Sequence, residues 1–335
     1  MVVDQLQRPL RDLRISVTDK CNFRCPYCMP ADVFGDDYKF SPKPNVLSFE
    51  EITQLVRVFA RMGTEKVRLT GGEPLLRKGL EVLVKELHHV EGIRDITLTT
   101  NGWLFQQQGE NLVKAGVNRI TFSLDSLDDA IFRKTNGRDY PVQKVLDSID
   151  HALALGLKPV KVNAVIKRGM NESQIVPLAR YAQEKGLVLR YIEYMDVGNR
   201  NGWKMSDVVT AAEMLAAIDA EMPLEALPPN YQGEVARRYQ YKDGTGEIGM
   251  ISSISEPFCG GCTRARLSTD GRLVTCLFSH EGLNLREPLR AGESDDMLLE
   301  RLVNAWTKRD DRYSELRLEG RVGKREKIEM YQIGG

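Results

Sequence analysis

The chain has 335 residues, of which 42% are hydrophobic and 28% charged, as is typical of a protein with a sizeable folded core. Lysine plus arginine and aspartate plus glutamate number 47 each, and this balance argues against a general nucleic-acid binder or a binder of acidic membranes. No stretch approaches about 18 consecutive apolar residues and the start, MVVDQLQRPL, has no apolar signal core, so we expect a cytoplasmic protein without a membrane span.

Short strand patterns alternate with helical patterns over the first two-thirds of the chain. Between the first two strands, Ser48 and Glu51 form a capping-box pattern, and Gly63 is the expected end of that helix. Strands joined by helical crossovers predict a parallel sheet with helices outside it. Six such units are too few for a closed eight-stranded barrel, so we expect an open, partial (β/α)6 barrel of the TIM type over residues 1–200. The expected strands are 12–19, 66–74, 95–102, 118–125, 159–166 and 187–195.

Alternate residues along these strands are polar. Lys66, Arg68 and Thr70 share one face of their strand, whereas Val67 and Leu69 share the other. Charges and hydroxyls are not the usual filling of a barrel, so this pattern indicates a substrate cavity. The same spacing recurs in two more strands, at Thr97, Thr99 and Asn101 and at Thr121, Ser123 and Asp125.

Basic residues recur on the strands that would line this cavity. Buried unpaired cations are costly, so a polyanionic ligand accounts for the set better than a closed core does. A surface salt bridge remains the alternative for any single member, and Asn163 and Asp125 are weaker candidates for the cavity wall. The basic residues are Arg14, Lys66, Arg68, Lys161 and Arg190.

Residues 201–335 form a smaller second region with a different pattern. An alanine-rich helix is expected at 211–220, a hairpin at 263–278 with Asp270–Gly271 as a type I′ turn, and a last helix at about 294–308. The polar tail ends in two glycines.

The six cysteines form two triplets, Cys21-x3-Cys25-x2-Cys28 and Cys259-x2-Cys262-x13-Cys276. In a reducing compartment such clusters favour metal or iron–sulfur ligation over disulfides. Each triplet is one ligand short of a closed site. Unrelated buried cysteines and a partial zinc site are the alternatives, but the four histidines show no ligand spacing. Three thiolates on a 4Fe–4S cluster would leave one iron open to another ligand.

The stretch CNFRCPYC, with Tyr27 before its last cysteine, resembles the signature of the radical S-adenosylmethionine (SAM) superfamily. The resemblance implies that the open iron chelates SAM and that one electron cleaves SAM to a 5′-deoxyadenosyl radical. Gly72 in TGGEP, Ser123 and Met195, together with Tyr27, would contact SAM. TGGEP is otherwise an ordinary turn, and Met195 points away from Arg190 unless it lies past the strand end.

The second triplet and the terminal Gly-Gly closely resemble the GTP 3′,8-cyclase family, and the likeness extends over CNFRCPYC, TGGEP, SLDS, KVNAVIKRGMN, RYIEYM, CGGCTRARLSTDG and MYQIGG. It implies conversion of GTP to (8S)-3′,8-cyclo-7,8-dihydroguanosine 5′-triphosphate, the first step of molybdenum-cofactor biosynthesis. Two 4Fe–4S clusters and SAM would be the cofactors, and the second open iron would bind the guanine edge.

The same resemblance assigns residues and partners. Arg264, Arg266, Gly334 and Gly335 would act in catalysis. A reductant such as flavodoxin or ferredoxin, a downstream cyclic pyranopterin monophosphate synthase and a homodimer are implied. A peptide-modifying radical SAM enzyme, an iron–sulfur electron carrier and a zinc-dependent binding module are the alternatives. The implied GTP contacts are Arg14, Lys66, Arg68, Thr99, Lys161, Arg190, Arg264, Ala265 and Arg266.

Overall fold

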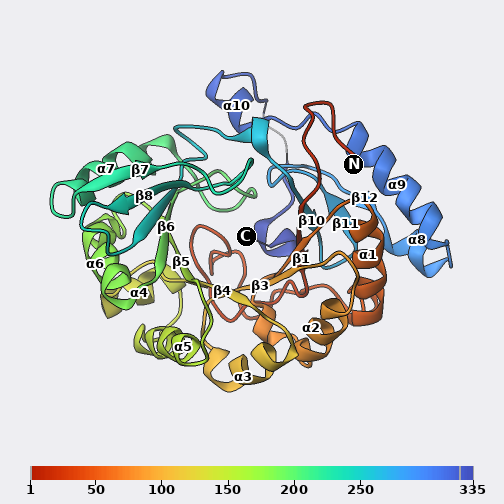
Figure 1. The fold of residues 1–335 in the computed structure, drawn as a ribbon, viewed down its shortest axis with the longest axis horizontal. Coiled ribbons are helices and arrows are strands. Elements are labelled where there is room, and N and C mark those ends of the chain that lie inside the picture. Colours follow the sequence, from red (N-terminus) through yellow and green to blue (C-terminus); the bar gives the residue numbers. More distant parts are fainter. Residues whose placement is uncertain (1, 324–325, 335) are drawn as a thin grey trace.

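The computed structural model describes residues 2–323 and 326–334. Six parallel strands follow one another in chain order and form an arc, with helices on its outer side (Figure 1). All six expected strands are therefore confirmed. Among the described residues β1 and β6 do not pair with each other, so the barrel is open. The strands are β1 (Asp12–Ser16), β2 (Lys66–Thr70), β3 (Asp95–Thr100), β4 (Arg119–Ser123), β5 (Val160–Ile166) and β6 (Val188–Glu193).

The first helix of the outer layer, α1 (Phe49–Arg61), starts and stops where local signals predict. Ser48 caps α1 through a 3.1 Å bond from the Glu51 backbone nitrogen, and the Glu51 carboxylate accepts the Ser48 backbone nitrogen at 2.7 Å, which confirms the capping box. Gly63, with φ +105°, directly follows the cap at this helix's end. The crossover helices are α1 (Phe49–Arg61), α2 (Leu80–His88), α3 (Phe105–Ala115), α4 (Asp129–Asn136), α5 (Gln143–Ala154) and α6 (Ile175–Lys185).

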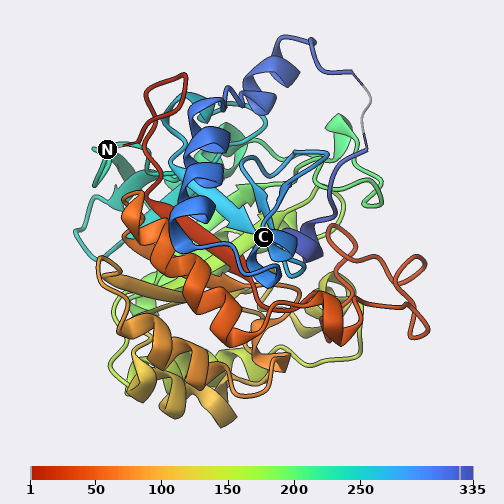
Figure 2. The same ribbon diagram turned by 90° about the vertical axis from the view of Figure 1, so that its right-hand side faces the viewer.

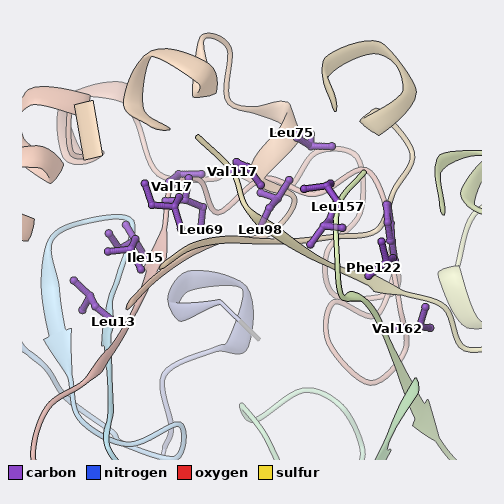
Figure 3. Packing of buried hydrophobic residues seen from close by; sticks show 14 of the residues in the cluster. Leu13, Ile15, Val17, Leu69, Leu75, Leu98, Val117, Phe122, Leu157 and Val162 are labelled. Carbon is purple, nitrogen blue, oxygen red and sulfur yellow. The ribbon is translucent and has the colours of Figure 1, made fainter. Parts of the chain in front are cut away.

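The hydrophobic core lies between the strands and these helices (Figure 3). Leu13, Ile15, Leu69, Leu98 and Phe122 are fully buried there. Each belongs to the strand face opposite the polar face, as the period-2 pattern predicts. The concave side is thus left to the polar residues.

The last third of the chain extends both edges of the same sheet. The strand β9 pairs in parallel with β6, and β10 pairs in parallel with β1. Whether 1–200 and 201–335 are separate domains stays a prediction. The strands are β7 (Leu224–Leu227), β8 (Arg237–Tyr241), β9 (Glu247–Ile251), β10 (Arg264–Leu267), β11 (Arg272–Val274) and β12 (Leu283–Asn284). The helices are α7 (Ala211–Asp219), α8 (Arg286–Arg290), α9 (Asp295–Thr307), α10 (Tyr313–Leu318) and α11 (Met330–Ile333).

Two of these helices were expected and are confirmed, α7 and α9. Figures 1 and 2 show α9 beside α1 on the outer face, where Gln54 donates to Asp295 at 2.8 Å. None of the helices in the described parts of the chain is both long and apolar enough to cross a membrane.

The expected hairpin is present as β10 and β11, but the prediction of a type I′ turn is wrong. Such a turn needs a left-handed backbone at both central residues, and only Gly271, with φ +81°, has one; Asp270 does not. The Ser268 hydroxyl donates to Asp270 at 2.5 Å and accepts the Arg272 backbone nitrogen at 2.8 Å. These side-chain bonds favour a wider turn that ends in the left-handed glycine.

Candidate active site

A cavity of about 570 Å³ lies inside the arc of strands. Its wall takes residues from all six parallel strands and from the β10–β11 hairpin. The predicted polar faces, such as Lys66, Arg68 and Thr70 on β2, do line it. The wall contains these expected site residues: Arg14, Cys21, Cys25, Tyr27, Cys28, Lys66, Arg68, Gly72, Thr99, Ser123, Lys161, Arg190, Met195, Cys259, Cys262, Arg264, Arg266 and Cys276.

Two expected residues that the structure describes, Gly334 and Ala265, are absent from the cavity wall. Ala265 lies within β10. Its side chain is fully buried in the hydrophobic core rather than in the cavity wall. The alternation of β10 explains this placement, because Arg264 and Arg266 occupy the opposite face. The expected GTP contact of Ala265 stays a prediction.

Met195 and Arg190 both line the cavity although the strand period places them on opposite faces. The strand β6 ends at Glu193, so Met195 already belongs to the following loop. Asn201 donates to the Met195 carbonyl at 3.0 Å and Trp203 to the Tyr194 carbonyl at 2.9 Å. These bonds hold the loop against the strand end.

The first cysteine triplet follows β1 at the carboxyl end of the sheet. The TGGEP segment at the end of β2 is hydrogen-bonded to the loop that leads to this triplet. The backbone nitrogens of Gly72 and Glu73 donate to the carbonyls of Thr18 and Lys20 at 2.7 and 2.8 Å. A Cβ on Gly72 would overlap the Lys20 carbonyl. Glycine is required here for the approach of the chain to its own cysteine loop.

Burial dominates the electrostatics of the first triplet. It raises the pKa of Cys21 to about 12, with a contribution from Glu73, and it also raises the pKa values of Cys25 and Cys28. Thiolates at this end therefore need a strong positive charge nearby, which coordinated iron supplies. Three half-buried thiols fit an iron–sulfur cluster in this respect.

Tyr27 has a defined partner at the same end. Its hydroxyl donates to Asp125 at 2.6 Å, and the other oxygen of Asp125 accepts the Val165 backbone nitrogen at 2.9 Å. Burial raises the pKa of Asp125 to about 6. Asp125, a weaker candidate for the cavity wall in the sequence, thus positions Tyr27.

The second triplet lies at the opposite, amino end of the sheet. Arg264, which starts β10, pairs in parallel register with Asp12 at the start of β1. Cys259 and Cys262 precede that point, and Cys276 follows the antiparallel β11, which returns to it. One cavity therefore connects the two triplets.

The charge around the second triplet is positive. Arg264 Nη2 lies 3.3 Å from Cys262 Sγ. Although burial opposes ionisation, Arg264 and Arg309 lower the pKa of Cys262 to about 6. A thiolate is a metal ligand in this form, so this donor set also fits a cluster. In the described ranges, no three Cys, His, Asp or Glu side chains lie close enough together to hold a single metal ion.

Between the triplets the cavity wall is strongly basic. Burial lowers the pKa of Lys161 to about 7, with a further effect from Arg190, and lowers that of Lys66 to about 8 against the opposing effect of Asp12. Burial and neighbouring cations lower the pKa values of Arg14 and Arg68 to about 9. The shifts show that these cations are crowded together.

The polar atoms of this basic region are only partly satisfied. Arg68 donates to Thr99 at 2.9 Å, and Arg190 donates to Thr121 at 3.3 Å. Arg190 Nε, Asn163 Oδ1 and Thr97 Oγ1 are buried without a hydrogen-bond partner in the described structure. Buried polar groups normally have partners, so the cavity wall fits an anionic ligand with many acceptor oxygens.

The C-terminal end of the chain lies inside the arc of strands, beside the cavity. Figure 1 shows α11, beside the label C, inside the arc of strands. The Tyr331 hydroxyl bonds that of Tyr38 at 2.7 Å, and Arg266 donates to the carbonyl oxygens of Ile333 and Gly334. Gly334 is therefore held beside Arg266, whereas Gly335 lies outside the described residues.

Several residues of the cavity wall were not predicted from the sequence: Asp12, Glu73, Arg119, Tyr231 and Arg309. Period-2 counting from Arg14 or Thr121 would have found Asp12 and Arg119. Glu73 accepts the Thr100 hydroxyl and the Asn101 backbone nitrogen, each at 2.7 Å, and no sequence signal pointed to these contacts. Tyr231 and Arg309 lie in loops without a pattern.

Two family models match the chain. One, for the radical SAM superfamily, matches residues 15–182. The other, described as Molybdenum Cofactor Synthesis C, matches residues 187–315.

Similar proteins cover the whole chain. It is 50% identical over 337 residues to a GTP 3′,8-cyclase of Staphylococcus haemolyticus (strain JCSC1435), with 100% of this chain and 99% of the relative covered. A GTP 3′,8-cyclase of Staphylococcus carnosus (strain TM300) is 48% identical with the same coverage. Among solved structures, Streptococcus suis SuiB bound to its precursor peptide SuiA has a TM-score of 0.62 at 16% identity, covering 93% of this chain and 67% of that one. This last likeness shows the fold alone.

Proposed function

The chain belongs to the GTP 3′,8-cyclase family of the radical SAM superfamily, and on that premise we propose that it converts GTP to (8S)-3′,8-cyclo-7,8-dihydroguanosine 5′-triphosphate. This is the first step of molybdenum-cofactor biosynthesis. The observation that carries the proposal is the single cavity, which joins two cysteine triplets through a basic wall. Neither an electron carrier nor a zinc module needs such a wall.

The cysteines would hold two 4Fe–4S clusters, Cys21, Cys25 and Cys28 the first and Cys259, Cys262 and Cys276 the second. Tyr27, Gly72, Ser123 and Met195 would contact SAM beside the first cluster. When bound, the first cluster and SAM supply the carbon radical that removes the 3′ hydrogen of GTP, and the second cluster supplies an open iron for the guanine edge.

The basic wall would hold the triphosphate. Guanidinium groups bind phosphate oxygens through paired donors, and Lys side chains bind them as point charges. The partnerless Arg190 Nε would gain an acceptor, and the crowded cations would gain a counter-charge. Positioning GTP between the two clusters in this way contributes to catalysis by restricting the reacting atoms. The proposed triphosphate ligands are Arg14, Lys66, Arg68, Thr99, Lys161 and Arg190.

Arg264 and Arg266 would act at the reacting nucleotide. Arg266 already donates to the Gly334 carbonyl, so the chain end lies directly beside this guanidinium. Gly334 presents backbone without a side chain there, and it would exclude water beside the substrate. We assign Gly335 to the same role from the family resemblance.

We further propose a cytoplasmic location, because free cysteines for iron–sulfur clusters persist in reducing compartments. A flavodoxin or ferredoxin would supply the electron. A cyclic pyranopterin monophosphate synthase would take the product, and a homodimer would be the assembly.

Anaerobic turnover with a matched variant tests the proposal. Reconstituted protein, SAM, dithionite and GTP should yield 5′-deoxyadenosine and the cyclised nucleotide, both measured by mass spectrometry. Cys276→Ala should retain SAM cleavage and lose cyclisation. If the parent protein forms 5′-deoxyadenosine but no cyclised nucleotide, or if Cys276→Ala still cyclises GTP, the substrate or the role of the second triplet is wrong.

A further inference from the structure

Three charged side chains form a buried network behind the second cysteine triplet: Asp4, Arg8 and Arg309. Their side chains are 0%, 2% and 2% exposed. Asp4 Oδ2 accepts Arg8 Nε at 2.6 Å and Arg309 Nη1 at 3.0 Å. Its other oxygen accepts the backbone nitrogens of Leu6 and Arg8, each at 2.9 Å. One carboxylate thus joins the two arginines.

Both arginines also donate hydrogen bonds to the backbone of the cysteines. Arg8 Nη1 donates to the Cys259 carbonyl oxygen at 2.7 Å, and Arg309 Nη1 donates to the Cys262 carbonyl oxygen at 2.8 Å. The segment around Asp4 and the segment after α9 are both distant in sequence from the turn that contains Cys259 and Cys262. Together they fix the backbone at two of the three cysteines.

Stability is a weak reason for such a network. Buried ion pairs lose much of their attraction to desolvation, and apolar replacements are often neutral or stabilising. Trp306 packs against the network, because Arg309 lies over the Trp306 ring at 4.6 Å and Trp306 Nε1 donates to the Arg8 carbonyl at 3.0 Å. The cysteine contacts give the network a positional role that its stability does not explain.

The network also controls local charge. Asp311 accepts Arg309 Nε at 3.0 Å and is 28% exposed. The two arginines are therefore balanced by Asp4 and Asp311, and loss of any one member leaves an excess of one sign. The reduction potential of an iron–sulfur cluster depends on nearby charge and hydrogen bonding. Positive charge favours the reduced form, because that form carries the additional electron.

We propose that Asp4, Arg8 and Arg309 are positioning residues for the second cluster, which fix the backbone of Cys259 and Cys262 and whose charge balance sets the reduction potential of that cluster. The inference rests on the proposed function, since it takes the second triplet as cluster ligands.

The test uses the full chain with Cys21, Cys25 and Cys28 replaced by Ala, so that only the second triplet can hold a cluster. Parent, Arg309→Gln, Arg309→Lys, Asp311→Asn and Lys308→Gln are reconstituted anaerobically. Iron and sulfide per chain, the EPR spectrum and the midpoint potential are measured. Lys308 is exposed and adjacent to Arg309, so it is the matched control for loss of one positive charge.

The proposal predicts midpoint shifts of opposite sign. Arg309→Gln should shift the potential to more negative values with an altered EPR spectrum, and Asp311→Asn should shift it to more positive values. Arg309→Lys keeps the charge and should lie closer to the parent than Arg309→Gln. Lys308→Gln should match the parent. A role confined to folding stability would leave the potential of the loaded chains unchanged.

The possible negative results distinguish failure of this inference from failure of the proposed function. Unchanged midpoints and spectra in Arg309→Gln and Asp311→Asn overturn the inference, as does an equal shift in Lys308→Gln. If Arg309→Gln does not fold by circular dichroism, the midpoint of Asp311→Asn decides in the same way. A folded parent that binds no iron through the second triplet would instead contradict the proposed function.

Discussion

Gly334 lies against Thr70 with no room for a side chain, because a Cβ at residue 334 would overlap Cγ2 of Thr70. Gly334 has φ +70°, in the left-handed region. Thr70 ends β2 and is the first residue of the TGGEP segment, whose next residues contact the first cysteine loop. The end of the chain therefore lies near the first cysteine triplet, while Arg266 ties it to the β10–β11 hairpin.

This contact predicts the effect of Gly334→Ala. The added methyl group should push the chain end out of place and lower turnover on the order of 100-fold, as small displacements in an active site do. Iron content and reductive cleavage of SAM should persist. Gly320→Ala is the matched control, since Gly320 has φ +69° and a Cβ added there would meet no described residue within 4 Å. Equal losses in the two variants would mean that backbone strain alone is responsible.

A second prediction separates substrate binding from stability. Arg190→Met removes a buried cation whose Nε has no partner in the described structure, so the unliganded protein should gain a few degrees in Tm by calorimetry. Affinity for GTP should fall about 10- to 100-fold, because a hydrogen bond to a charged group contributes about 1.5–3 kcal/mol. Arg301→Met removes an exposed cation paired with Glu293 and should change neither quantity by much. A lower Tm with unchanged affinity for Arg190→Met would contradict the assignment.

The third prediction concerns pH. Burial lowers the pKa of Lys161 to about 7 from 10.5, so the unfolded chain binds more protons than the folded one between these values. The penalty to stability is full below pH 7 and is relieved as pH rises toward 10.5. A bound triphosphate should raise this pKa again, so binding takes up a proton and weakens as pH rises above about 7.

Titration calorimetry at about pH 8 measures this uptake, because the terminal phosphate is then ionised and Lys161 is mostly neutral in the free protein. Heats in two buffers of different ionisation enthalpy give the number of protons. Lys161→Met should reduce the uptake. If the parent takes up none, or if Lys161→Met leaves the uptake unchanged, Lys161 does not contact the ligand.

The fourth prediction tests the glycine behind the first cysteines. Gly72→Ala should displace Lys20 and the loop to Cys21, so the iron of the first cluster should be lost while the EPR signal of the second remains. Gly323→Ala should keep both, because a Cβ added at Gly323 would meet no other described residue within 4 Å. Full iron content in Gly72→Ala would show that the loop tolerates the change.

The sequence was sufficient for the arc of parallel strands, because period-2 alternation and the Ser48–Glu51 cap are local signals. It also identified both triplets, whose spacing is itself the motif. It missed β7 to β9, which lie at the sheet edge with mixed patterns such as RRYQY, and α10 and α11, which are too short for helical periodicity to show. The network of Asp4, Arg8 and Arg309 was out of reach, because Arg309 is 305 residues from Asp4 along the chain and meets it only in the fold.

The central claim is that this cavity places the 3′ hydrogen of GTP beside SAM, and isotope transfer tests it most directly. GTP carrying deuterium only at C3′ is incubated anaerobically with the reconstituted protein, SAM and dithionite, and the 5′-deoxyadenosine is analysed by mass spectrometry. The account predicts one deuterium in the 5′-deoxyadenosine formed during turnover, and none when the label is at C8. Unlabelled 5′-deoxyadenosine from the 3′-labelled GTP, while cyclised nucleotide accumulates, would contradict it.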